Sequence, residues 1–169
     1  MQNATHLGTW TYGRAPTVLP KVPTLQAIKR LQDAVGAVEQ VECPVEHFFA
    51  PGMYVRKCSI PAGSVVVGKM HRHQHPTMLT KGTATINTDR GMETITAPHI
   101  WISQENAKRA LYTHTDCEFV TVHLNPDDCT DLERIEADVI VPDGLIDYDA
   151  QEVRALVGEF HDELQGVYA

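Results

Sequence analysis

The chain has 169 residues, 43% of them hydrophobic, which is enough for one domain with a buried core. No apolar run is long enough to span a bilayer, which argues against a membrane partner. Residues 1–115 carry a charge of +5 (12 basic, 7 acidic), whereas residues 116–169 carry −13 (2 basic, 15 acidic) and would repel the phosphates of a nucleic acid.

The first 47 residues contain a predicted arm and a predicted helix. Residues 1–23 combine several glycines and prolines with little hydrophobic periodicity, which predicts an extended arm. Thr24 is a suitable N-cap for a helix that runs to about residue 38. Apolar residues recur there at helical spacing, at Leu25, Ile28, Leu31 and Val35. We therefore expect residues 24–47 to form a helix and a linker beside the main domain.

Residues 48–125 predict a small antiparallel barrel or sandwich. Seven or eight short β-rich runs follow one another at close spacing. Their separators carry turn residues, such as Pro61-Ala62-Gly63 and Asp89-Arg90-Gly91. Gly82 interrupts an otherwise continuous strand pattern, which predicts a bend or a bulge at this position.

Residues 126–169 predict an acidic helical extension. Thr130-Asp131-Leu132-Glu133 has the form of a capping box and would start a helix that runs to about residue 137. A short strand over residues 139–141 and a turn at Pro142-Asp143-Gly144 follow. A final helix is expected from Asp149 to about residue 165, because its apolar residues form a helical stripe (Val153, Leu156, Val157, Phe160 and Leu164).

Three histidines, His71, His73 and His75, lie within five residues in the middle of the chain. On extended backbone, period-2 alternation places all three imidazoles on one face of a strand. Imidazole is the commonest protein ligand of transition metals, so this cluster indicates a metal site. The alternative is that the three histidines are polar side chains of a barrel wall that hydrogen-bond to one another or to the backbone.

The segment 68–86 resembles the first sequence motif of the cupin superfamily, which has a His-x-His pair, a following Glu and a glycine turn. Leu79-Thr80-Lys81-Gly82 matches the turn, and parts of the segment 100–123 resemble the second motif. The resemblance covers about residues 48–125. It implies a mainly β fold, the cupin-like double-stranded β-helix, which is a jelly-roll barrel that can hold a metal ion in its mouth. This chain departs from the motif. Counting back from Gly82 places His75 at the Glu position, His71 at the second His and Lys69 at the first. If His71 pairs with His73, or His73 with His75, then Thr77 or Leu79 stands where the Glu is expected.

The histidines and this resemblance together indicate a metal site on His71 and His75, with His73, His114 or His123 as a third ligand. Fe, Mn, Ni or Zn would suit such imidazole ligands. His123 lies in an apolar run, which favours a core position over a metal-binding one. Lys108 and Arg109 stand where the second motif supplies a ligand. Their charges would repel a metal ion but could clamp an anionic substrate.

Four stretches resemble a group of small cupin-type proteins of tailed bacteriophages, namely residues 45–54, 67–71, 79–82 and 130–136. This implies a phage origin and a location in the host cytoplasm or in the virion. The four cysteines are scattered without a C-x-x-C pair, which agrees with a reducing compartment. We predict a non-catalytic structural or interaction protein that forms homo-oligomers or assembles with phage proteins through its arm and helices. The alternative prediction is a metal-dependent cupin enzyme or a small-molecule binder.

Overall fold

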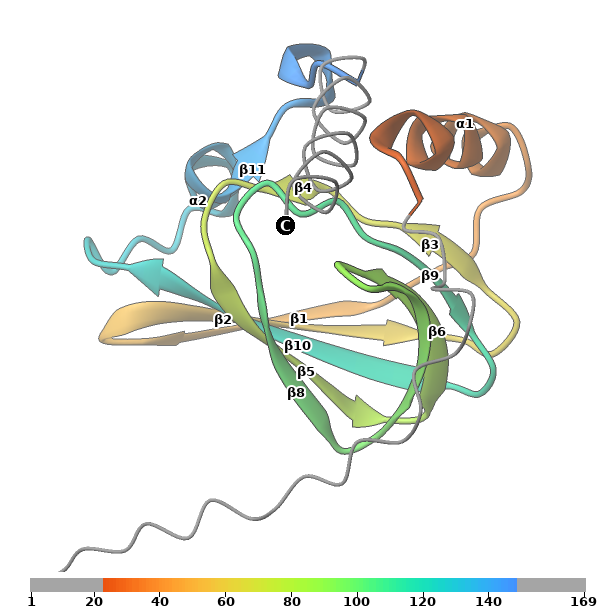
Figure 1. The fold of residues 1–169 in the computed structure, drawn as a ribbon. Helices are drawn as coiled ribbons and strands as arrows, with labels where there is room; N and C mark the ends of the chain where they lie inside the picture. The colour runs from red at the N-terminus through yellow and green to blue at the C-terminus, as the bar shows by residue number, and fades with distance from the viewer. Residues whose placement is uncertain (1–22, 149–169) are drawn as a thin grey trace, which may run out of the picture.

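The computed structural model describes residues 23–148. They form a jelly-roll barrel, in which two antiparallel sheets face each other and helices lie outside (Figure 1). The predicted fold class, a mainly β jelly-roll barrel, is thus confirmed. The predicted arm, except for its last residue, and the predicted final helix lie outside the described residues.

The larger sheet has five strands in the order β1-β2-β10-β5-β8. The smaller sheet has four strands in the order β3-β9-β6-β7, and a short pair, β4 and β11, lies beside them. The strands of the larger sheet are β1 (Val45–Ala50), β2 (Gly52–Ile60), β10 (Cys117–Asn125), β5 (His75–Lys81) and β8 (His99–Ser103). The other strands are β3 (Val65–Val67), β9 (Ala110–Thr113), β6 (Thr83–Thr88), β7 (Gly91–Thr96), β4 (Met70–His71) and β11 (Ile140–Val141).

The barrel begins earlier than the sequence pattern indicates. Strand β1 starts at Val45, three residues before the expected boundary at residue 48, and pairs with β2 from Val45↔Cys58 to Ala50↔Met53. The sequence obscured this edge strand because most of it is exposed and its first half contains Glu46 and His47. Edge strands bury little surface, so their hydrophobic pattern is weak.

Two helices flank the barrel, α1 (Leu25–Gly36) and α2 (Leu132–Val139). The predicted N-cap of α1 is confirmed, since the Thr24 hydroxyl accepts a hydrogen bond from the backbone N–H of Ala27 at 3.1 Å. The N-cap of α2 is Asp131 and not the predicted Thr130. Its carboxylate accepts hydrogen bonds from the backbone N–H groups of Glu133 and Arg134 at 3.0 and 3.3 Å. A carboxylate also complements the positive N-terminal end of the helix.

Gly82 separates β5 from β6 and lets the chain pass from one sheet to the other. Its φ of +90° is in the region that favours glycine, and a Cβ atom there would lie 2.2 Å from the backbone oxygen of Asp116. On the strand opposite, the register shifts between Glu118 and Phe119. The bend predicted from the sequence is therefore a change of sheet.

The hydrophobic core fills one end of the space between the two sheets. It consists of buried residues from both sheets, namely Cys58, Ile60, Leu79, Ala84, Ile86, Ile95, Cys117 and Phe119. A second, smaller cluster joins Tyr54 of β2 to Ile135 and Val139 of α2 at the other end of the larger sheet.

None of the helices within residues 23–148 is both long and apolar enough to cross a bilayer.

Candidate metal centre

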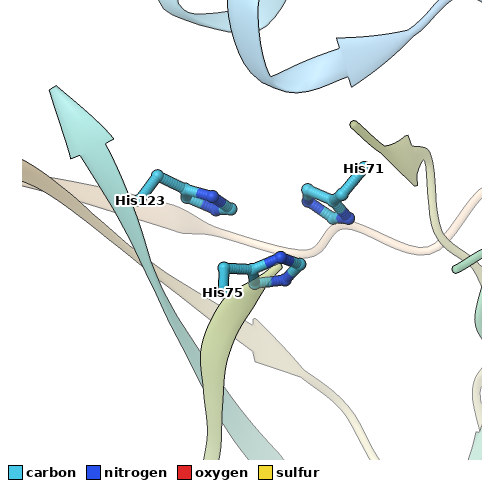
Figure 2. Close-up of side chains that lie close together, drawn as sticks. All are labelled: His71, His75 and His123. Atoms are coloured by element: carbon cyan, nitrogen blue, oxygen red, sulfur yellow. The ribbon is translucent and has the colours of Figure 1, made fainter. Parts of the chain in front are cut away.

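Three histidines from three strands meet in the mouth of the barrel, and Figure 2 shows their rings turned toward one another. His71 comes from β4, His75 from the first position of β5 and His123 from β10. One potential ligand nitrogen of each lies within 4.8 Å of the other two. The ring centroids are 4.3 Å apart for His71 and His75, 4.6 Å for His75 and His123, and 5.3 Å for His71 and His123.

Backbone pairing holds each histidine in place. His75 pairs with Ser103 of β8, and His123 pairs with Tyr54 of β2. Strand β4 is short, and His71 is held by pairing with Ile140 of β11 and by the hydrogen bond from the backbone N–H of Asn106 to its carbonyl oxygen, at 2.7 Å. Since β11 directly follows α2, the docking of α2 on the barrel fixes the position of His71.

The cluster is electrically neutral at physiological pH. The pKa of His71 is lowered to about 3, chiefly by burial and to a smaller extent by the neighbouring His75, His123 and Arg56. Burial also lowers the pKa of His123 to about 4, with smaller contributions from His75 and Arg56. For His75 the pKa is lowered, again chiefly by burial. Neutral imidazoles are the protonation state that binds metal ions.

The hydrogen bonds of the histidines set which nitrogen is free. The Nδ1 atom of His75 lies 3.0 Å from the backbone oxygen of His73 and donates to it, which leaves the Nε2 lone pair of His75 available. The Nε2 atom of His123 lies 3.1 Å from the hydroxyl of Thr121. Such partners behind a ligand orient its ring, and here both come from the same strand as the histidine or from the turn before it.

An aromatic wall adjoins the cluster on the β1 side. The Tyr54 ring stacks on His123 with centroids 6.0 Å apart, and its hydroxyl lies 2.7 Å from Nδ1 of His47. Burial raises the pKa of the Tyr54 hydroxyl, so it stays protonated. The ring of Phe49 lies 5.6 Å from that of Tyr54. The buried Tyr54 ring therefore covers one side of His123.

The structure separates the candidates that the sequence left open for the third ligand. His123 joins His71 and His75, although its apolar strand favoured a core position. His73 is exposed and contributes only its backbone oxygen. His114 is also exposed, and its Nε2 atom lies 2.7 Å from the hydroxyl of Thr85.

The two cations expected to clamp an anion already have partners. The ammonium group of Lys108 is buried and forms an ion pair with Asp143 at 3.0 Å. Arg109 donates to the backbone oxygen of Asn87 at 2.9 Å and lies 3.6 Å from Asp89. The sequence analysis did not predict a third cation, Arg56, as a site residue. It could have been found from the alternation of Tyr54, Arg56, Cys58 and Ile60, because period-2 alternation places these residues on the same, inner face of β2.

The donor set fits a divalent transition metal ion. Metal–nitrogen bonds of about 2.0–2.1 Å place the ligand atoms of one ion about 3–4 Å apart, close to the observed span. The set is all-imidazole, and no carboxylate or thiolate of residues 23–148 joins it. Three neutral ligands leave further coordination positions for water or for another molecule.

Comparisons with known proteins do not assign an activity to this chain. No family model and no curated protein matches the chain. One similar solved structure is a cupin superfamily protein from Desulfitobacterium hafniense, with 13% identity over 53% of this chain and 85% of that chain and a TM-score of 0.40. Another is a cupin 2 domain-containing protein from Halorhodospira halophila, with 19% identity over 61% of this chain and 82% of that chain and a TM-score of 0.43. A third is salicylate 1,2-dioxygenase from Pseudoaminobacter salicylatoxidans, solved with gentisate, with 10% identity over 68% of this chain and 32% of that chain and a TM-score of 0.47.

Proposed function

We propose that this chain binds one divalent transition metal ion through His71, His75 and His123 and holds a small molecule beside it. The observation that supports this most directly is the convergence of three buried or partly buried neutral imidazoles, with one nitrogen each within 4.8 Å. A hydrophobic barrel that needed only packing at this point would not favour three adjacent imidazoles, because each one must satisfy two ring nitrogens.

A bound ion would act as a Lewis acid with open positions, which can polarise an oxygen of a ligand or lower the pKa of bound water. The protein residues would supply orientation and exclusion of water. The His73 carbonyl and the Thr121 hydroxyl would hold two of the rings, and the Tyr54 ring would cover His123. Imidazole ligands suit Fe, Mn, Ni and Zn alike, and no single ion is favoured.

Metal titration of the purified, metal-free protein tests this proposal. We expect one equivalent of Zn²⁺ or Co²⁺ to bind, as measured by calorimetry and by elemental analysis after gel filtration. His71→Ala, His75→Ala and His123→Ala should each weaken binding by at least about tenfold, since each removes one of three ligands.

His73→Ala and His114→Ala are the matched controls, because both remove an imidazole without touching the cluster. Circular dichroism and thermal unfolding of every variant separate a lost ligand from a lost fold. Folded ligand variants that keep the wild-type stoichiometry and affinity would overturn the proposal, as would wild-type protein that binds no metal.

The non-catalytic role predicted from the sequence, as a phage-encoded structural protein or a virion component, stays a prediction. It depends on the arm and the final helix, which lie outside the described residues. It does not conflict with metal binding, because a structural protein can also hold an ion.

A further inference from the structure

Arg56 lies on the inner face of the barrel beside the histidine cluster, and its charge has no partner among residues 23–148. Its position in β2 is on the same face as the buried residues Tyr54 and Cys58, and it pairs with Thr121 of β10. Its positive charge is close enough to lower the pKa of both His71 and His123. No hydrogen bond or ion pair to its guanidinium forms within residues 23–148. Other buried or half-buried cations of the barrel, such as Lys108, do have such partners.

Two hydroxyl groups share the row of Arg56 across the sheet. The register aligns Arg56 with Thr121 and Thr121 with Thr77 on β5. Thr77 is only 7% exposed, and its Oγ1 atom has no hydrogen-bond partner among the described residues. This row lies between the histidines His75 and His123 and the hydrophobic core that begins at Leu79 and Phe119. A buried unpaired hydroxyl is costly, which indicates that a group other than residues 23–148 completes it.

The charge of a metal-loaded site would favour an anion. With a divalent ion bound, three neutral imidazoles and an arginine would carry a net charge of +3, and no carboxylate of residues 23–148 belongs to the cluster. Arg56 and His71 are partly buried, so solvent screens their surroundings only in part and the charge attracts an anion. Arginine binds planar carboxylates through paired hydrogen bonds better than any other side chain does.

We propose that the small molecule held beside the metal is a carboxylate, which Arg56 binds by its charge and Thr77 by a hydrogen bond. The inference rests on the proposed metal site. The anion-binding role that the sequence analysis gave to Lys108 and Arg109 is here given to Arg56, on the inner face of the barrel. Since the row lies inside the barrel next to the hydrophobic core, we expect the carboxylate to belong to a small molecule.

Acetate and its neutral analogue acetamide are suitable probes. The visible spectrum of the Co²⁺-loaded protein reports binding at the metal without any assay of activity. We expect acetate to change this spectrum and acetamide to leave it unchanged at the same concentration. Arg56→Gln should weaken acetate binding by about tenfold or more, and Thr77→Val by about threefold, as expected for one charged and one neutral hydrogen bond.

Lys57→Gln is the matched control, because Lys57 is the next residue of the same strand and pairs with Glu46 on the outer face at 2.5 Å. It removes the same charge and should leave acetate binding unchanged. Arg56→Gln should bind Co²⁺ at least as tightly as the wild type, since it removes a repulsive charge.

The outcomes separate the two proposals. If the wild type binds no Co²⁺, the metal site itself is refuted and this inference with it. If Co²⁺ binds but Arg56→Gln and Lys57→Gln bind acetate equally well, or acetamide binds as well as acetate, only the carboxylate proposal is refuted.

A second, independent observation concerns the outer face of the five-stranded sheet, meaning the side chains that point away from the barrel. Apolar residues occupy it on every strand, including Phe48, Met53, Ile100, Ile102, Val122 and Leu124. The most exposed of them are Leu124 at 86%, Ile100 at 69% and Ile102 at 51%. The ion pair of Glu46 and Lys57 lies at one end of this face.

We propose that the outer face is the contact surface for a second copy of this chain. Its five most exposed apolar residues present on the order of 500 Å², which is near the upper limit for patches on monomers and approaches the roughly 800 Å² per partner of a standard interface. Five strands span about 20 Å, whereas a single helix is about 10 Å across, so another sheet covers the face better than a helix does. Sheets with apolar faces pack on each other in this way.

Sedimentation equilibrium of the full-length protein tests this surface. We expect a mass of twice 18.8 kDa for the wild type and a folded monomer for Val122→Glu, which places a charge at the centre of the outer face. Leu145→Glu, at a residue that is 73% exposed outside this sheet, should remain a dimer. A monomeric wild type would mean that segments 1–22 or 149–169 cover the face or that nothing does. That result, or a Val122→Glu dimer, would overturn the proposal.

Discussion

The imidazole rings of His71 and His75 lie with their centroids 4.3 Å apart, although their strands belong to different sheets. At this distance one ring can be protonated only at the cost of burying a charge beside its neighbour. The fold therefore keeps both rings neutral, and the pKa values of all three histidines are lowered from that of free histidine. This has a consequence for the stability of the metal-free protein.

Acid should destabilise the metal-free protein well above the range in which carboxylates are protonated. The pKa values of His71 and His123 are about 3 and 4 in the folded state, whereas histidine in an unfolded chain has a pKa of about 6.5. Between these values the unfolded state binds more protons, so stability falls as the pH decreases from about 6.5. Each of the two histidines should contribute a loss of about 2 kcal/mol at pH 5. Urea unfolding at pH 7 and pH 5, with a chelator and at one protein concentration, measures the loss.

Between pH 7 and pH 5, the variant His71→Gln/His123→Gln should lose about 4 kcal/mol less free energy of unfolding than the wild type does. His114→Gln, which replaces an exposed histidine, should behave like the wild type. An equal pH dependence in the double variant and the wild type would show that the buried histidines are not its source.

Asp143 neutralises the buried ammonium of Lys108 and connects three parts of the structure. It lies in the 3₁₀ helix η1 (Asp143–Leu145), accepts a hydrogen bond from Gln32 of α1 at 2.5 Å, and pairs with Lys108 at 3.0 Å. These hydrogen bonds lower the pKa of Asp143. Asp143→Asn should destabilise the protein by about 2 kcal/mol, less than for a fully buried pair because Asp143 is 45% exposed.

The cost should decrease when the lysine is also removed. Lys108→Met/Asp143→Asn leaves no unpaired buried charge and should be more stable in denaturant unfolding than Asp143→Asn alone. If the double variant is the less stable of the two, the buried ammonium is not what makes the single substitution costly.

Gly82→Ala should be one of the most destabilising single-methyl additions in this chain. The new Cβ atom would meet the backbone oxygen of Asp116 at 2.2 Å and Sγ of Cys117 at 2.7 Å, at a φ of +90°. Gly63→Ala is the matched comparison, because Gly63 has a φ of +76° with nothing within 4 Å. We expect a loss of about 1–2 kcal/mol for Gly63→Ala from backbone strain alone, and a loss of at least about 3 kcal/mol for Gly82→Ala. Similar losses for both variants in thermal unfolding would show that the local structure moves to avoid the clash.

Leu79→Ala tests the position of the hydrophobic core. Leu79 is fully buried between the sheets, so its truncation should leave a cavity and lower the free energy of unfolding by about 2–5 kcal/mol. Leu145→Ala, at a residue that is 73% exposed, should change it by less than about 0.5 kcal/mol. Equal effects of the two substitutions in urea unfolding would contradict the core described here.

The sequence by itself determined the β-rich segment, both flanking helices within the described residues and the change of direction at Gly82. These features depend on hydrophobic periodicity, capping side chains and glycine. Such signals lie within a few residues along the chain and can therefore be found in the sequence alone. Two of the three clustered histidines, His71 and His75, were also predicted from the sequence. The predicted extended backbone was wrong, however, because the chain bends at residues 72 and 73 and His71 and His75 lie on different strands. Strand β1 was missed since an exposed edge strand has a weak pattern.

Only the tertiary structure decided the rest of the site. His123 is 48 residues from His75 in an apolar strand, and it joins the cluster because β10 pairs between β2 and β5. The same pairing aligns Arg56, Thr121 and Thr77 in one row, whereas Lys108 and Arg109 are bound to acidic or backbone partners. Strand order is set by the packing of two sheets around a common core, a property of the whole chain that no short stretch of sequence contains.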